Sequence, residues 1–180
     1  MQVPGLVGTI IDIIVALALI FSFIGGLRSG AIKEFFGLLA FIISLPLTPV
    51  FYGYAVSWFS FVNDATWRGL LGFLVTMGII ILLLYLIFWA PRLWLEKIWN
   101  SGFFFSFLGG ILGVVNSALG MVLVVNLLDL FPVSSWLDAA LTSSGVLNWL
   151  VNVLGTFVLS LLRSLHSVGM VASISFFAAL

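Results

Sequence analysis

The sequence predicts an all-α integral membrane protein, a helical bundle with four transmembrane helices and a C-terminal amphipathic helix. Of its 180 residues, 63% are hydrophobic and only 7% are charged, whereas a soluble globular chain carries about 25% charged residues. Four apolar stretches each reach the roughly 20 residues that a helix needs to cross a bilayer. Apolar runs such as residues 79–84 do not alternate with polar residues, which favours helices over membrane strands.

We expect one membrane domain, residues 1–180, because nothing in the sequence divides it. Its predicted spans are residues 5–27, 31–50, 70–90 and 103–128. The first span has no basic residue before Arg28, so we interpret it as a retained helix rather than a cleaved signal peptide. The second is expected to kink or fray at Pro46 and Pro49, and the third to end at Pro91.

The segments between the spans differ in character. Residues 25–30 contain three glycines and predict a tight turn, since glycine relieves the limits on backbone conformation. Residues 51–69 predict a longer aromatic connection, and residues 91–102 predict a short amphipathic helix on the membrane surface. Residues 135–144 resemble a small helix outside the membrane that begins at a capping box.

A fifth apolar segment, residues 146–163, carries a polar stripe. The polar residues recur every three or four positions and are Asn148, Asn152, Thr156, Ser160 and Arg163. Either the segment lies in the membrane interface, or it crosses the membrane with the stripe against the bundle. We favour an interfacial helix, because the segment is short for a span.

The basic residues of the short loops predict the orientation. With four spans, Arg28, Lys33, Arg92 and Lys97 fall on one side of the membrane, and Arg68 falls on the other. Lys and Arg in short loops are enriched on the cytoplasmic side. We therefore expect a multi-pass protein of the inner (plasma) membrane with its N-terminus outside.

Asp12 interrupts the first predicted span and is the sharpest candidate for a functional residue. A charged aspartate at a helix centre costs about 2.5–3.5 kcal/mol on insertion scales. The neighbours of Asp12 on the same helical face are small or polar, namely Gly5, Gly8, Thr9 and Ala16. They predict that Asp12 faces other helices, either as a proton or ion site or as a hydrogen-bonding clamp. We favour the clamp, because no basic residue lies at a similar depth.

The first turn supplies four further candidates, which are Arg28, Gly30, Lys33 and Glu34. Glu34 suits the start of a helix, where the helix dipole favours negative charge. Arg28 and Lys33 set the topology and can also hold anionic lipid head groups.

The fourth span has a face of small residues that predicts close helix packing. Gly109 and Gly113 form a GxxxG motif, which lets two helix backbones approach closely. Ser117 continues this face, and Asn116 lies beside it, where its amide can hydrogen-bond across the contact.

The sequence contains few of the residues and motifs that enzymes use for catalysis. It contains no cysteine and a single histidine, His166, so a thiolate or multi-histidine metal site cannot form. Nucleotide-binding loops, zinc-protease motifs and nucleophile elbows are absent from it. We therefore expect no catalytic residue, no metal and no cofactor. The net charge of zero gives no general attraction to nucleic acid.

The segment Gly26–Glu34 (GLRSGAIKE) resembles the glycine- and arginine-rich turn of the colicin V production protein (CvpA) family. In that family an aspartate precedes the turn by about the same distance as Asp12 does here. Glu96 and Lys97, followed by Leu108-Gly109-x-x-x-Gly113, resemble the family's amphipathic stretch and its later helix. The resemblance covers about residues 10–125.

This resemblance implies a bacterial inner-membrane protein connected with colicin V (toxin) production or export and with envelope homeostasis. We expect a non-enzymatic accessory or scaffold protein whose partners are the lipid bilayer and either further copies of itself or other membrane proteins. The alternative is a small channel or transporter subunit that uses Asp12. A pore needs a continuous polar path, and the scarcity of polar residues in the spans favours the scaffold.

Overall fold

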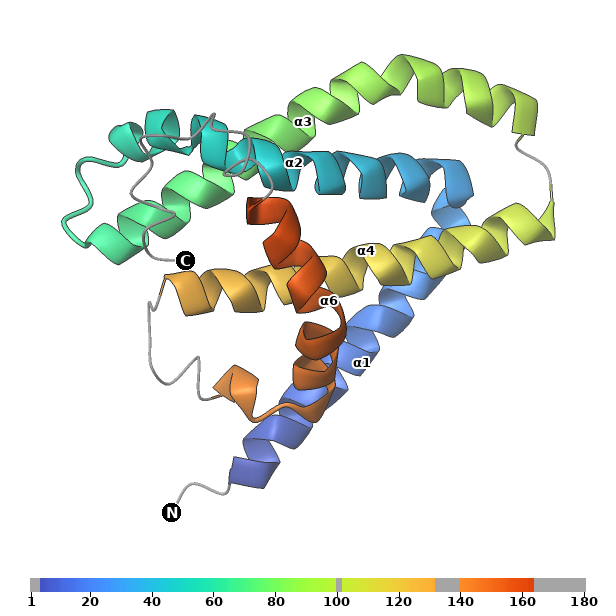
Figure 1. Cartoon of the computed structure of the whole chain (residues 1–180). Coiled ribbons are helices and arrows are strands. Elements are labelled where there is room, and N and C mark those ends of the chain that lie inside the picture. Colours follow the sequence, from blue (N-terminus) through green and yellow to red (C-terminus); the bar gives the residue numbers. More distant parts are fainter. Residues whose placement is uncertain (1–3, 100–101, 132–139, 164–180) are drawn as a thin grey trace.

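A computed structural model of the chain describes residues 4–99, 102–131 and 140–163. The helices are α1 (Pro4–Ser29), α2 (Ala31–Trp58), α3 (Ala65–Trp99), α4 (Phe103–Leu130) and α6 (Gly145–Arg163) (Figure 1). The first four are long and apolar enough to cross a membrane, and α6 is a shorter apolar helix. The predicted fold class, with four spanning helices and a C-terminal helix, is confirmed.

The second and third helices are longer than predicted. α2 continues through Pro46 and Pro49 to Trp58, and α3 begins at Ala65. The connection predicted over 51–69 is therefore wrong at both ends, and the chain leaves helix only over 59–64. Prolines are tolerated inside membrane helices because neighbouring groups re-satisfy the freed backbone, and here Pro49 is fully buried against the core.

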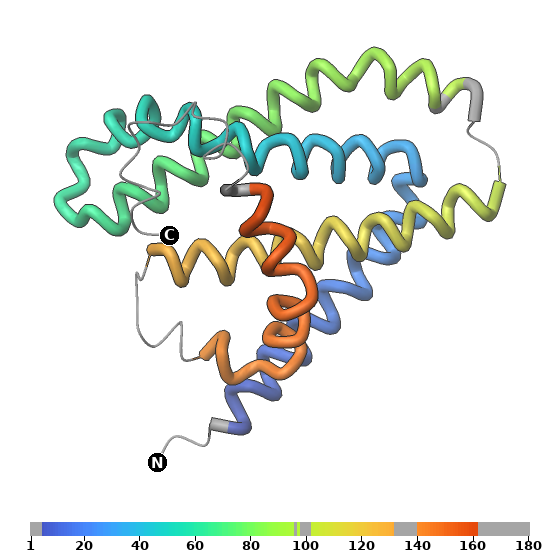
Figure 2. Tube along the Cα trace, viewed as in Figure 1, coloured from blue at the N-terminus to red at the C-terminus, as the bar shows by residue number. Residues whose placement is uncertain are grey.

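The separate surface helix predicted over 91–102 is also wrong. α3 runs without a break through Pro91 as far as Trp99, and it bends along its second half (Figure 2). Proline removes one backbone donor and crowds the preceding turn, which bends a helix without ending it when the flanking turns are intact. The side chain of Glu96 lies outside the described residues.

The turn between α1 and α2 is shorter than predicted. α1 includes both Gly25 and Gly26, and only Gly30 leaves the helical conformation, with a φ of 82°. The Gly30 N–H still donates to the carbonyl of Gly26 at 2.9 Å. Glycine is needed at Gly30 because other residues rarely adopt a positive φ, whereas Gly26 serves packing, as described below.

The helices are layered so that α2 packs against both α3 and α4, and α4 packs in turn against α1. α1 crosses α4 close to its own C-terminal end and diverges from it toward its N-terminus (Figure 1). α6 fills the opening between them, runs across α4 and reaches α2. The turn from α1 to α2, the C-terminal end of α3 and the start of α4 lie at one end of the bundle (Figure 1).

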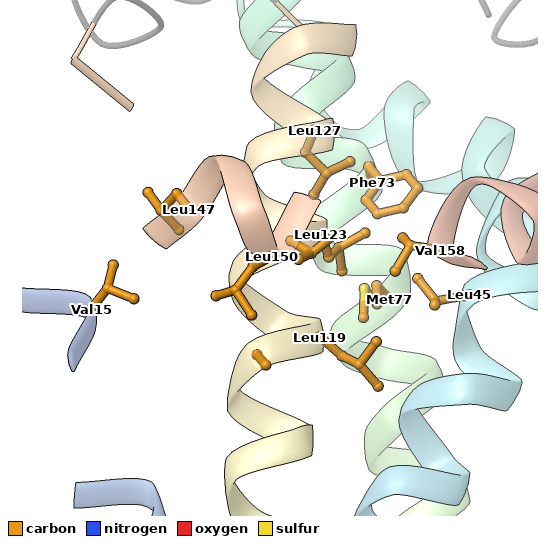
Figure 3. Packing of buried hydrophobic residues seen from close by; sticks show 12 residues of the cluster. Val15, Leu45, Phe73, Met77, Leu119, Leu123, Leu127, Leu147, Leu150 and Val158 are labelled. Atoms are coloured by element: carbon orange, nitrogen blue, oxygen red, sulfur yellow. The ribbon is translucent and has the colours of Figure 1, made fainter. Parts of the chain in front are cut away.

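The buried core lies where α6 crosses the bundle. Leu150 and Val158 of α6 pack among side chains of α2, α3 and α4, including Leu45, Phe73 and Leu123 (Figure 3). The polar stripe of α6 faces the other way, because Asn148, Asn152, Thr156 and Ser160 are all exposed. This arrangement rules out the alternative in which the stripe lies against the bundle. Of the helix predicted over 135–144, residues 135–139 lie outside the described residues, and 140–142 form a helical turn.

Candidate functional site

Asp12 binds the beginning of α6. One oxygen of its carboxylate, Oδ1, accepts a hydrogen bond from the Ser144 hydroxyl at 2.5 Å and another from the Val146 backbone N–H at 3.0 Å. The Ser144 hydroxyl oxygen in turn accepts from the Leu147 N–H at 3.1 Å. Two residues more than 130 positions apart in sequence therefore act together on one helix terminus.

This geometry is a helix cap shared between two segments. The first N–H groups of a helix have no partner inside the helix. A serine just before the helix commonly accepts from the third helical residue, as Ser144 does from Leu147. Asp12 satisfies the neighbouring donor, Val146, and its negative charge is favourable at the positive end of the helix dipole.

Gly8 allows this contact to form. A Cβ at Gly8 would collide with the backbone carbonyl of Ser143, so only glycine lets α1 come this close to the chain that precedes α6. Gly8 lies one helical turn before Asp12 and therefore on the same face. The small-residue stripe that was noted in the sequence thus contains a functional close approach, while Gly5 meets nothing within 4 Å.

At the other end of α1, glycines bring α1 and α4 into backbone contact. A Cβ at Gly26 would meet the carbonyl of Gly109, and a Cβ at Gly109 would meet Gly26 and Gly30. A Cβ at Gly113 would lie 2.6 Å from the carbonyl of Ser22. The partner of the predicted GxxxG face is therefore α1 of the same chain.

Asn116 and Glu34 connect α4 to the start of α2. The Asn116 side-chain amide donates to the Glu34 backbone carbonyl at 3.3 Å and to its carboxylate at 3.4 Å. Both residues line an open groove of about 430 Å³, together with Ser117 and Gly113. Both hydrogen bonds are long, so each is a weak contact.

The basic residues of the first turn lie at the same end of the bundle. Arg28 and Lys33 are exposed, and they line a second cavity of about 330 Å³ that also includes Arg92. Arg28 and Lys33 are thus near Glu34 in sequence but face a different cavity. In the described ranges no three histidine or acidic side chains gather as metal ligands would, and the expectation of no metal and no cofactor stays a prediction.

Three contact residues were missed at the sequence level, and they are Gly110, Ser144 and Val146. Gly110 is buried, and a Cβ there would press on the ring of Phe23. A signal for Ser144 exists, because a serine directly before an apolar helix is a typical N-cap. No local pattern shows which distant residue would complete that cap.

A comparison with protein-family models identifies a match. The model of the colicin V production protein family matches residues 11–155 of the chain. The chain belongs to the colicin V production protein family. The matched region begins one residue before Asp12 and ends inside α6, so both sides of the shared helix cap lie within the family region. A search of curated proteins and a search of solved structures found no match.

Proposed function

We propose that this protein is a non-enzymatic accessory or scaffold protein of the inner membrane that serves colicin V (toxin) production or export and envelope homeostasis. Membership in the colicin V production family supports the cellular context. The observation that carries the scaffold role is the use of Asp12 as a helix cap. Its hydrogen bonds join α1 to α6 and leave the acid in the role of a structural contact.

The buried polar side chains support the same proposal. Ser44, Thr48 and Thr76 each donate their hydroxyl to a carbonyl of their own helix at 2.7 Å. The amide of Asn126 does the same to the carbonyl of Val122 at 2.8 Å. The donors of these groups are satisfied within their own helices, and the buried cluster of the described residues is apolar, which favours a packed bundle over a polar path for an ion.

The exposed stripe of α6 is the surface that we propose for partners. Asn152 and Thr156 are exposed on a helix whose opposite face is buried against the bundle. Trp149, Val153 and Phe157 are also exposed on this helix, so the surface that the bundle leaves open is both polar and apolar. This face therefore suits another protein, either a further copy of the chain or another membrane protein. Crosslinking from Asn152 in native membranes, followed by a pull-down, tests which of these it meets.

Paired substitutions at Asp12 separate the scaffold from a channel or transporter subunit. The full chain is expressed in a colicin V-producing strain that lacks its own family member, and secreted toxin is measured. Asp12→Asn keeps an acceptor oxygen but cannot titrate, so a scaffold retains export while Asp12→Leu loses it. In proteoliposomes neither parent nor variant should conduct ions. The channel would be favoured if the parent chain conducts ions and the Asn variant, although it melts normally, loses both ion flux and export.

We also propose that the N-terminus lies outside and that the α1–α2 turn lies in the cytoplasm, as the basic residues suggest. A cysteine at Ser29 should then react only with reagents that reach the cytoplasm. A cysteine at Asn63, which is exposed between α2 and α3, should react from outside. Labelling of Ser29→Cys from outside in intact cells reverses the orientation.

A further inference from the structure

A cavity of about 330 Å³ lies at the end of the bundle where α1 meets α2 and where α4 begins. Three cationic side chains line it, and they come from three different segments. Arg28 lies in the last turn of α1, Lys33 in the first turn of α2, and Arg92 in the last part of α3. Positive charges from separate elements that converge on one cavity create a local field that attracts anions.

The backbone adds to this field. The cavity is also lined by first-turn residues of α2 and by Gly102 and Ser106 at the start of α4. Neither α2 nor α4 has a side-chain cap at its N-terminus. The first N–H groups of both helices therefore contribute partial positive charge beside the three side chains. Glu34, the nearest acid in sequence, lines the neighbouring groove and contacts Asn116 instead.

Exposed aromatic side chains are close in sequence to residues that line the cavity. Phe103 and Phe104 open α4 next to Gly102, and their side chains are 85% and 66% exposed. Trp94 of α3 is also largely exposed. Aromatic side chains of this kind are enriched at the boundary between hydrocarbon and head groups. A basic cavity with exposed aromatic residues close to it in sequence is the combination that suits the phosphate of a lipid together with its acyl chains.

We propose that this cavity binds a phosphate group, and that its source is the head group of an anionic phospholipid. Arg28 supplies a planar guanidinium that can bind two phosphate oxygens, and Lys33 supplies a mobile point charge. The cavity is of the size that proteins use for small ligands. The site is separate from the Asp12 cap, and the proposed scaffold function does not depend on it.

The full chain, purified in a neutral detergent, is titrated with phosphatidylglycerol, with phosphatidylcholine and with inorganic phosphate. Native mass spectrometry counts retained lipids, and thermal melting reports binding in all three arms. We expect one phosphatidylglycerol to be retained per chain and to raise the melting temperature, with little effect of phosphatidylcholine. If inorganic phosphate raises the melting temperature as much as phosphatidylglycerol does, the cavity is a phosphate site but its assignment to lipid is overturned.

Arg28→Gln and Lys33→Gln should each weaken phosphatidylglycerol binding about tenfold, as expected when one charge-assisted hydrogen bond is lost. Lys97→Gln is the matched control, because Lys97 is an exposed cation of the same end that does not line the cavity. The melting temperature without lipid shows whether each variant is folded. If Arg28→Gln is not folded, Arg28→Lys replaces it in the binding measurement. Equal weakening by Lys97→Gln, or equal binding of both lipids, overturns the proposal.

Discussion

The two ends of α1 are held by different means. Near its C-terminus, Gly26 and Ser22 touch the backbone of α4 at Gly109 and Gly113. Near its N-terminus, where α1 has diverged from α4, Asp12 hydrogen-bonds to the start of α6. The first contact is a direct approach of two helix backbones, whereas the second adds the hydrogen bonds of one charged side chain to the close approach at Gly8.

This difference follows from the lack of a hydrophobic driving force between helices in lipid. Two helices associate there through close packing or through polar contacts. Packing requires backbones that run close together, which glycines allow at the crossing. Where the helices diverge, α1 is attached to the start of α6 by the Asp12 hydrogen bonds, beside the close approach at Gly8. The two ends should therefore respond differently to substitution, and four variants examine that expectation.

The largest effect on stability is expected where α1 crosses α4. Gly113→Leu places a side chain against the Ser22 carbonyl, and rigid helix backbone cannot move aside cheaply. We expect the free energy of unfolding to fall by about 3 kcal/mol, the upper part of the usual range for overpacking. Gly120→Leu on the same helix is the control, since a Cβ there meets nothing within 4 Å. Melting in detergent measures both, and equal melting temperatures would falsify the role of this face.

The next largest effect is expected at the cap. Asp12→Leu removes the acceptor of the Ser144 hydroxyl and of the Val146 N–H, which should lower stability by about 1–3 kcal/mol. Asp12→Asn keeps one acceptor oxygen and should lose less. Hydrogen exchange of the first turn of α6 locates the effect. Unchanged exchange in the Leu variant would mean that Asp12 does not secure α6.

A smaller effect on stability is expected at Gly8, where the backbone of α1 approaches the segment that carries the cap. Gly8→Ala places a single methyl group against the Ser143 carbonyl, and Ser143 lies outside the helices. Alanine alone should favour a helix by about 1 kcal/mol over glycine, as Gly5→Ala will show in open space. We expect Gly8→Ala to be about 1 kcal/mol less stable than Gly5→Ala. A difference as large as that of Gly113→Leu would show that the connection is rigid.

The smallest effect is expected for the polar contact at the crossing end. The Asn116 hydrogen bonds to Glu34 are 3.3 and 3.4 Å long, so Asn116→Leu should cost about 0.5 kcal/mol. Ser117→Ala in the same groove is its control. Chemical denaturation of both variants measures this difference. If Asn116→Leu lowers the free energy of unfolding more than Asp12→Leu does, polar contacts would be the main attachment at both ends of α1.

The spans were predictable because length and apolarity leave a membrane segment few alternatives. Their ends were not, since Pro46 and Pro91 are strong helix breakers in water but are accommodated in these helices. Asp12 and the glycines of α4 stood out because each is unusual in its local sequence. Their partners could not be found, because the contact of Asp12 with Ser144 depends on how α1 diverges from α4, and no local pattern encodes that.

The shared cap also sets an order in time. Asp12 and Ser144 are separated by 132 residues, and a ribosome adding about 5–20 residues per second needs roughly 7 to 26 s to cover them. During that interval the first helix is already made, and the partner of its carboxylate has not been synthesised. A nascent chain that stops before residue 144 leaves the acid without Ser144 and Val146. The cap thus distinguishes a chain that has been made as far as the start of α6 from one that stops before it.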